Sequence, residues 1–246
     1  MIRLAFAFLA AALLGASAPD DKEDLAKAAE KTRELENYKF KGRLSVEGVP
    51  FLSEPIEYNG AYVKDKGFTA SMGPVGTIFR LDKKIALKDP ESGEWIQVKG
   101  VTKVGDGPMA AQISVVARGL KPPHEELKKF EDRFKEVRKK EGVEKIGDVE
   151  CAVYEGALTE AGVRGLLPGG AGVFLGKGTF EGTGRVWIGG EGRILRFETN
   201  CKIELDQDSS TMELTIKRTT EFAEVGKASV EMPLEVKKLF AQDDSK

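Results

Sequence analysis

A period-two alternation of apolar and polar residues recurs along most of this chain and constrains its fold more than any other feature. In the clearest segment, Tyr38, Phe40, Leu44 and Val46 alternate with lysine, arginine, serine and glutamate. Alternation of this kind gives a β-strand one dry face and one wet face. Similar alternation or short apolar runs occur at 56–63, 68–72, 77–81, 85–88, 95–98, 151–158, 185–188, 195–205 and 212–222.

The joints between these segments are short and rich in turn residues, as in Asp89 to Gly93 and Gly189 to Gly192. Parallel strands would need a crossover of about a dozen residues or more, usually a helix, between successive strands. The sequence therefore predicts strands joined in order as an antiparallel meander.

Two segments have helical periodicity. Residues 21–36 place an apolar stripe among charged residues, which predicts an amphipathic helix. A second helix is predicted from Pro122-Pro123 to Glu141, ending at Gly142, with Leu127, Phe130, Phe134 and Val137 as its apolar stripe. This central helix either packs as a lid on the sheet or lies on a membrane surface. Its nearly balanced charges favour the packed lid.

A sheet of roughly ten strands with one apolar face must be covered or curl onto itself, and two helices are too few to cover it. We therefore expect an α+β fold in which a strongly curved antiparallel sheet, a half-barrel, wraps around the N-terminal helix and the central lid helix. Such a shape favours an apolar cavity, although the same residues could fill a closed core. The candidate lining residues are Phe40, Leu44, Val46, Ile56, Tyr58, Phe79, Leu81, Phe197, Ile203, Leu214 and Ile216 on strands, with Leu127, Phe130 and Phe134 on the lid helix.

The N-terminus has the pattern of a secretory signal peptide. A positive start containing Arg3 precedes an apolar run from Leu4 to Leu14 and a small-residue site that ends at Ala18. Pro19 disfavours cleavage after Ala18, so cleavage after Ala16 is an alternative. The alternative fate of this run, a buried N-terminal helix, fits poorly because the run has no polar face.

We therefore expect residues 1–18 to be a signal peptide and residues 19–246 to form a single domain. No cysteine follows the apolar run, so a lipid anchor of the usual bacterial type is not expected, and the run is shorter than the roughly 20 residues of a membrane span. These features predict a soluble protein of the periplasm or a similar exported compartment.

Composition excludes several classes of function. The formal charge of −2 provides no field for holding nucleic acid, and one histidine with two cysteines cannot form the common zinc sites. His124 follows two prolines at a predicted helix start, where we expect it to be solvated. No nucleophile elbow is present that could pair with it. We therefore expect no metal, no cofactor and no enzymatic activity.

The segment from Gly165 to Gly178 combines glycines with apolar residues. It lacks the strand-to-helix setting of a phosphate-binding loop. We expect a hairpin excursion whose apolar tip either folds back on the core or contacts a membrane or protein partner at the mouth of the cavity. The residues of this candidate mouth loop are Leu166, Leu167, Val173, Phe174 and Leu175.

Cys151 and Cys201 lie on separate predicted strands of a chain expected to be exported, where a disulfide is permitted. A bridge between them would stabilise the fold by roughly 3 to 4 kcal/mol on the loop-entropy model. Two buried thiols are the alternative, because strand register cannot be predicted closely enough to place the two sulfur atoms.

Several motifs together resemble one known superfamily. A helix followed by "YKFKGRLSVEG", a meander with "GTIFRLDKKIALKDPESGEW", a central helix, and then "GDVECAVYEGAL" and "GRVWIGGEGRILRFETN" resemble the LolA/LolB-like lipoprotein carriers. The closing "EFAEVGKASVEMP" is most similar to the LppX/LprG-type lipid-binding branch. The resemblance covers essentially the whole chain after the signal segment.

The resemblance implies a half-barrel of about eleven antiparallel strands with helices in its mouth and a cavity that shields acyl chains between membranes. In the LolA carriers an arginine on an early strand helps to hold the lid helices. Arg43 lies in the similar stretch here, although the alternation places it on the polar face. The LppX/LprG-type proteins commonly carry a lipid anchor, which this chain lacks the cysteine to form.

Two functional hypotheses follow. The first is a monomeric carrier of lipid or acylated lipoprotein that contacts a membrane or membrane protein transiently. The second is a non-enzymatic structural or interaction protein of the envelope that keeps the half-barrel with a closed core. An apolar void of about 300 Å³ or more between sheet and helices would favour the first.

Overall fold

The structure is a computed structural model, and it describes residues 19–48, 54–73, 76–98, 117, 120–166, 178–207 and 210–243. The predicted signal peptide, 1–18, and most of the candidate mouth loop lie outside the described residues. Among the described residues, no helix is both long enough and apolar enough to cross a bilayer.

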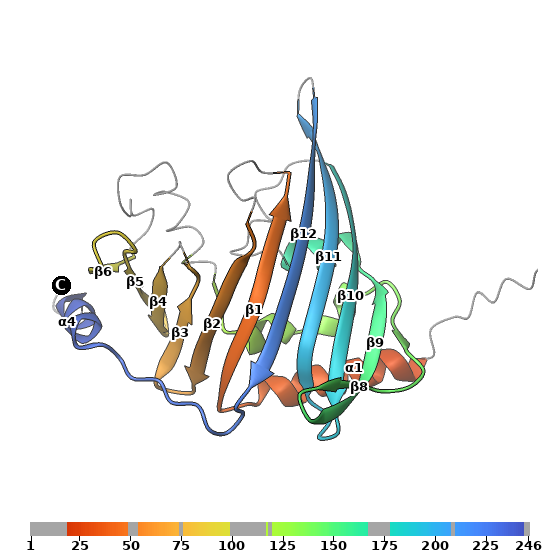
Figure 1. Cartoon of the computed structure of the whole chain (residues 1–246), viewed down its shortest axis with the longest axis horizontal. Helices are drawn as coiled ribbons and strands as arrows, with labels where there is room; N and C mark the ends of the chain where they lie inside the picture. Colours follow the sequence, from red (N-terminus) through yellow and green to blue (C-terminus); the bar gives the residue numbers. More distant parts are fainter. Residues whose placement is uncertain are drawn as a thin grey trace, which may run out of the picture.

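The described part of the chain forms one large antiparallel sheet of twelve strands (Figure 1). The spatial order is β6-β5-β4-β3-β2-β1-β12-β11-β10-β9-β7, with β8 paired to β9. The strands are β1 (Asn37–Glu47), β2 (Ile56–Val63), β3 (Gly67–Ser71), β4 (Thr77–Leu81), β5 (Lys84–Lys88), β6 (Trp95–Gln97), β7 (Arg138–Lys139), β8 (Glu144–Ile146), β9 (Val149–Ala157), β10 (Gly178–Gly189), β11 (Ile194–Gln207) and β12 (Ser210–Ala223).

The first and the last strand, β1 and β12, pair with each other in the middle of this sheet. Strands β1 to β6 step towards one edge, and β9 to β12 step back from the other edge until β12 pairs with β1. The predicted antiparallel meander is therefore confirmed within each half of the sheet, whereas the pairing of β12 with β1 was not predicted.

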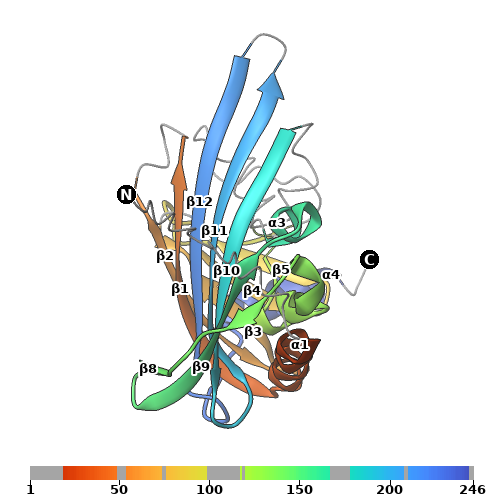
Figure 2. The ribbon, with the colours of Figure 1, turned by 90° about the vertical axis from the view of Figure 1, so that its right-hand side faces the viewer.

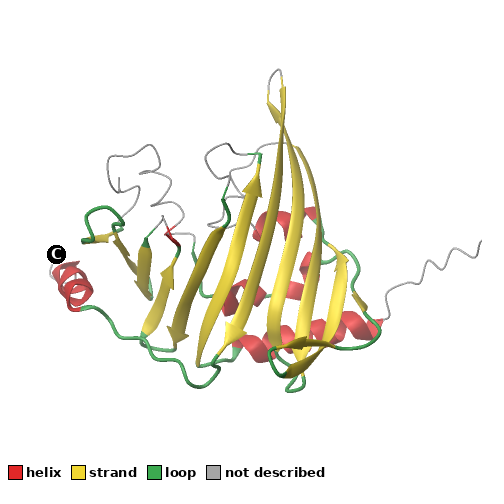
Figure 3. Cartoon of the chain, viewed as in Figure 1, coloured by secondary structure: helices red, strands yellow, loops and turns green. Residues whose placement is uncertain are grey.

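Helical elements lie mainly on one side of the sheet, which we call the α1 face (Figures 2 and 3). Helix α1 (Pro19–Arg33) packs Leu25, Ala28 and Ala29 against that face. The other elements are the 3₁₀ helices η2 (Pro123–Leu127) and η3 (Phe130–Arg133), and the helices α3 (Glu160–Leu166) and α4 (Leu234–Asp243).

Helix α4 packs on the opposite face of the sheet, beyond β6 in Figure 1. Its residues Val236 and Phe240 form a cluster with Phe79 of β4, Ala86 of β5 and Ala61 of β2. On β4 the neighbouring Ile78 belongs instead to the core beneath α1. Strand β4 is therefore buried on both faces.

The long central helix predicted over 122–141 is wrong. Residues 123–137, called the lid segment here, form η2 and η3, and the chain then becomes β7. Lys128 is extended and Lys129 is left-handed at φ 51°, which ends the helical turn between the two 3₁₀ helices. The residues after η3 are extended because they pair with β9. Lys135 N donates to Ala157 O at 2.8 Å, and β7 continues this pairing.

The strong curl expected of the sheet is also wrong, although the α+β class and the large antiparallel sheet are confirmed. The sheet is open and not strongly curled. The expectation counted only two covering helices. Helices α3 and α4 add cover on opposite faces, so apolar strand surface is buried without the sheet closing on itself.

Candidate functional site

The α1 face carries one continuous apolar cluster that joins the sheet to the lid segment. Eleven of the fourteen predicted lining residues belong to this cluster or pack against it. They are Phe40, Leu44, Ile56, Tyr58, Leu127, Phe130, Phe134, Phe197, Ile203, Leu214 and Ile216.

The other three predicted lining residues lie elsewhere. Val46 is half-buried and pairs with Ile216, which places it on the α1 face outside the cluster. Phe79 and Leu81 were assigned to the wrong face, because they pack with α4 on the far side of the sheet.

Aromatic rings form the junction between lid segment and sheet. The ring centroid of Phe130 lies 5.6 Å from that of Phe134 and 5.6 Å from that of Phe197 on β11, both in edge-on geometry. A Cβ atom at Gly184 of β10 would stand 2.6 Å from the Phe134 ring, so this strand position must be glycine for Phe134 to dock. The lid segment is thus fitted closely to the strands beneath it.

A buried ion pair interrupts this apolar cluster. Arg218 of β12 lies on the α1 face, and its Nη1 is 2.9 Å from Glu126 Oε2 of η2, while its Nη2 donates to Glu126 Oε1 at 3.1 Å. Their side chains are only 8% and 17% exposed, respectively. Burial opposes the charge of Arg218, but the Glu126 carboxylate and the Tyr58 side chain outweigh burial and raise the Arg218 pKa.

Tyr58 fixes the other side of the guanidinium. Arg218 Nε donates to Tyr58 Oη at 3.2 Å, and that oxygen also lies 2.7 Å from Thr219 O and 2.6 Å from Thr220 Oγ1. Gly42 of β1 leaves the space for this tyrosine, because a Cβ there would collide with its ring. The polar group at the centre of the face is therefore held rigidly by the sheet.

Sequence reasoning missed Arg218, although a signal was present. On β12 the alternate residues Leu214, Ile216, Thr220 and Phe222 all lie on the α1 face, and Arg218 stands among them in the same phase. A charged residue at a dry position of a strand indicates a buried partner. Arg43, considered on the ground of resemblance, instead forms an exposed ion pair with Glu57, 3.4 Å away.

His124 is buried, which overturns the expectation that it is solvated. Its Nδ1 lies 2.7 Å from Tyr38 Oη, its backbone N donates to the same oxygen at 3.2 Å, and its ring centroid lies 4.3 Å from that of Tyr62. Burial, together with the positive charge of Arg33, lowers the pKa of His124 to about 4. The imidazole is therefore neutral at pH 7 and acts as a structural contact between the lid segment and β1.

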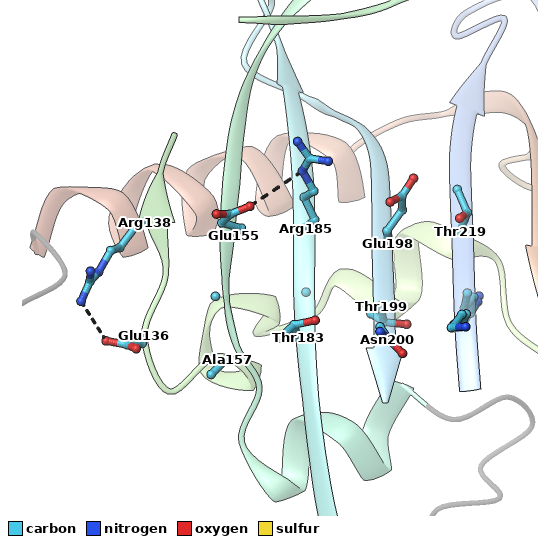
Figure 4. A pocket seen from close by; sticks show the side chains of 14 residues that line it. Glu136, Arg138, Glu155, Ala157, Thr183, Arg185, Glu198, Thr199, Asn200 and Thr219 are labelled. Atoms are coloured by element: carbon cyan, nitrogen blue, oxygen red, sulfur yellow. Dashed lines mark hydrogen bonds and ion pairs between the residues drawn. The ribbon is translucent and has the colours of Figure 1, made fainter. Parts of the chain in front are cut away.

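Two depressions lined by described residues lie away from the α1 face. One, of about 760 Å³, is an open, polar hollow on the opposite face of β9 to β12. Figure 4 shows Arg185 and Glu155 directed toward each other in it, with Nε 3.9 Å from Oε2, and Glu198 and Thr219 beside them. The other, of about 640 Å³, lies between α4 and β5–β6, next to Trp95. Neither is the apolar cavity expected between sheet and helices.

Cys151 and Cys201 are free and buried, so the disulfide considered from the sequence does not form. They face opposite sides of the sheet: Cys201 packs in the cluster beneath α1, whereas Cys151 packs with Val153 and Trp187. Burial raises the Cys201 pKa to about 11 and also raises that of Cys151. Neither thiol has the character of a nucleophile.

Of the candidate mouth loop, the described residues include only Leu166, at the end of α3, while Leu167, Val173, Phe174 and Leu175 lie outside them. The ranges that are described contain no group of three or more histidine, cysteine, aspartate or glutamate side chains arranged to hold a metal ion.

Comparison with known proteins places the fold. No protein-family model and no curated protein sequence matches the chain. LprF from Mycobacterium bovis is similar in structure, with a TM-score of 0.50 and 14% identity over 90% of this chain and 99% of that chain. A LolA superfamily protein from Nitrosomonas europaea matches with a TM-score of 0.33 and 13% identity over 91% and 98% of the two chains. The structural similarity expected from the sequence motifs is confirmed, and the chain has the fold of LprF.

Proposed function

We propose that this chain binds the acyl chains of a lipid or acylated lipoprotein beneath its lid segment and carries them between membranes. The observation that carries the proposal is the construction of the α1 face. A broad apolar surface is covered by short pieces, α1 and the lid segment, rather than by another sheet or a long helix. Displacing the lid segment would expose Phe130 and Phe197 to an acyl chain, and each methylene buried there contributes about 0.8 kcal/mol.

The proposal includes the expected cellular context. Residues 1–18 direct export, residues 19–246 act as one domain, and the mature protein is a monomer in the periplasm. The candidate mouth loop, around Leu166 and Leu175, contacts a donor or acceptor membrane transiently. The function is non-enzymatic and needs no cofactor, because holding an acyl chain requires an apolar surface and an opening rather than a reactive group.

The decisive experiment is extraction of the natively exported protein. The protein is purified from the exported fraction without detergent and extracted with organic solvent, and the extract is analysed by mass spectrometry. We expect acyl species at a stoichiometry near one per chain, above the amount found with an unrelated exported protein treated in parallel. Background lipid alone, on protein whose circular dichroism confirms a folded sheet, would exclude the carrier function.

A second candidate function rests on a specific observation. The described side chains between α1, the lid segment and the sheet are packed, and the two depressions near β9–β12 and near α4 lie outside this packing. This packing favours a non-enzymatic envelope protein with a closed core that acts through a protein partner. The two candidates differ in the response to added amphiphile: a carrier takes it up and its lid segment changes conformation, whereas a closed core remains as it is.

A further inference from the structure

Three charged side chains lie close together on the α1 face among the described residues. Glu126 is the carboxylate paired with Arg218, and Arg133 of η3 interacts electrostatically with both. Burial is the main effect on Arg133, and the neighbouring Arg218 adds to it; together they lower the Arg133 pKa even though Glu126 opposes them. Within the described part of the chain, the two guanidinium groups and the Glu126 carboxylate therefore lie near one another in a largely apolar setting.

Aromatic rings surround these guanidinium groups and offset part of the cost of their burial. The Arg218 guanidinium carbon lies 5.8 Å from the centroid of Tyr58 and 5.7 Å from that of Phe197, and Arg133 lies 5.6 Å from that of Phe130. A buried ion pair loses hydration that its own attraction rarely exceeds, and well-packed apolar residues in its place are often as stable or more so. Stability alone therefore does not account for Arg218 on this face.

The two partners of the ion pair are held very differently. Arg218 is in the middle of a fourteen-residue strand, paired on one side with Leu44 of β1 and on the other with Thr199 of β11. Glu126 belongs to a five-residue 3₁₀ helix that ends at an extended Lys128 and a left-handed Lys129. The cation is fixed by the sheet, and the carboxylate arrives on a short piece of the cover.

We propose that Arg218, assisted by Arg133, binds the anionic group of an amphiphilic cargo, and that Glu126 occupies this position when no cargo is bound. The planar guanidinium presents two parallel N–H groups, which match a carboxylate or a phosphate equally well. Entry of such a group displaces Glu126 and with it η2, which uncovers the apolar cluster for the attached chain. This inference rests on the proposed function and adds the charge of the cargo to it.

The test compares hexadecyl probes that differ only in their polar group: hexadecanoate, hexadecyl phosphate and uncharged hexadecanol. Binding is measured by isothermal titration below the critical micelle concentration of each probe. We expect at least one of the two anionic probes to bind about tenfold more tightly than hexadecanol, a difference of about 1.4 kcal/mol. The carboxylate and phosphate arms then show which anion the site prefers.

Two variants locate the effect. Glu126→Gln removes the internal competitor and should increase affinity for the preferred anionic probe about fivefold relative to hexadecanol. The double variant Arg218→Met with Glu126→Gln should abolish the preference for the anion while hexadecanol still binds. The matched control is Arg43→Met with Glu57→Gln, which removes an exposed pair of the same residue types from the opposite face and should change nothing.

The outcomes separate the two proposals. If all three probes bind equally and the variants leave their affinities unchanged, the anion site is wrong and the acyl carrier function stands. If no probe binds and no acyl species co-purifies, both are wrong. If the double variant does not fold, Glu126→Gln decides alone, since an unchanged ratio of anionic to neutral affinity in that variant excludes competition by Glu126.

Discussion

Acidification tests how His124 holds the lid segment to the sheet. The chain contains one histidine, so its titration can be followed without assignment by mutagenesis. Tyr38 Oη accepts the backbone N–H of His124, and in the tautomer that leaves Nδ1 without a proton it donates its own proton to Nδ1. Protonation of Nδ1 would remove that acceptor and place a positive charge in a buried position near Arg33.

The size of the effect follows from the pKa difference. The folded-state pKa of about 4 is below the ordinary 6.5, so the unfolded chain binds the proton first as the pH falls. The stabilisation is complete above about pH 6.5 and is lost progressively down to about pH 4, below which both states are protonated. At about 1.4 kcal/mol per pH unit the whole effect is about 3 kcal/mol, of which about 2 kcal/mol is lost between pH 7 and pH 5.

The assay is urea unfolding of the untagged protein at pH 7, 6 and 5, compared with His124→Gln. Glutamine offers an oxygen that can accept the Tyr38 hydrogen bond but does not titrate, so carboxylates contribute equally to both proteins. The wild type should lose about 2 kcal/mol more than the variant over this range. Parallel curves within about 0.5 kcal/mol, or an NMR titration of the imidazole with a midpoint near 6.5, would refute the buried neutral histidine.

Three further predictions follow from burial. Cys151 and Cys201 should remain thiols in protein purified without reductant, with an intact mass unchanged by reduction, and should react with a thiol reagent only when urea unfolds the chain; a mass increase of about two hydrogens on reduction would contradict this. Phe240→Ala should destabilise the fold by about 3 kcal/mol, whereas Leu234→Ala on the exposed side of α4 should stay within about 0.5 kcal/mol; equal effects would show that α4 is not docked on the sheet. Phe130→Ala should cost about 3 to 5 kcal/mol in urea unfolding, and a cost below about 1 kcal/mol would mean that the lid segment is not packed on the sheet.

The antiparallel pairing of successive strands and most strand bounds could be predicted because one physical pattern repeats, whereas the pairing of β12 with β1 could not. The expected segments 56–63 and 77–81 coincide with β2 and β4. Strand β10 was predicted to begin at Arg185, although it begins at Gly178. Three glycines between these positions interrupt the apolar alternation, so the first half of the strand carries no periodic signal.

The predictions fail where the apolar pattern of a segment does not identify one buried face. Strand β4 is buried on both faces, so its sequence does not indicate whether Ile78 or Phe79 faces the lid segment; the structure shows that Ile78 does. Helix α4 was missed because it buries only a narrow apolar stripe, with Val236 and Phe240 one turn apart. The apolar spacing of the lid segment fits a helix, but backbone pairing with β9 is available to its second half and prevails.

The buried polar contacts of the candidate site could not be placed from sequence, since they join residues far apart along the chain. His124 meets Tyr38 and Glu126 meets Arg218 only after the meander has brought β12 beside β1. The alternation along β12 indicates that Arg218 faces the apolar side of the sheet. Its partner Glu126 lies on η2, a 3₁₀ helix within a segment that was predicted as one long α-helix. The face of the sheet on which a strand residue lies is therefore predictable from periodicity, whereas contacts across the lid segment are not.

Besides the apolar packing of Leu127, Phe130 and Phe134, the lid segment is attached by polar contacts of two kinds, which lie at its two ends. At its start, His124 and Glu126 contact the sheet through polar groups. Protonation would weaken the contact of His124 with Tyr38, and an anion would compete with Glu126 for Arg218. At its end, Lys135 and β7 pair with β9 through backbone hydrogen bonds, which neither protonation of His124 nor an added anion would break. Left-handed Lys129 lies between the two parts, so release of the polar contacts would free η2 while the β7 end stays in place. The proposed opening would therefore begin at the η2 end, which lies over the buried Arg218 that would receive the anionic group.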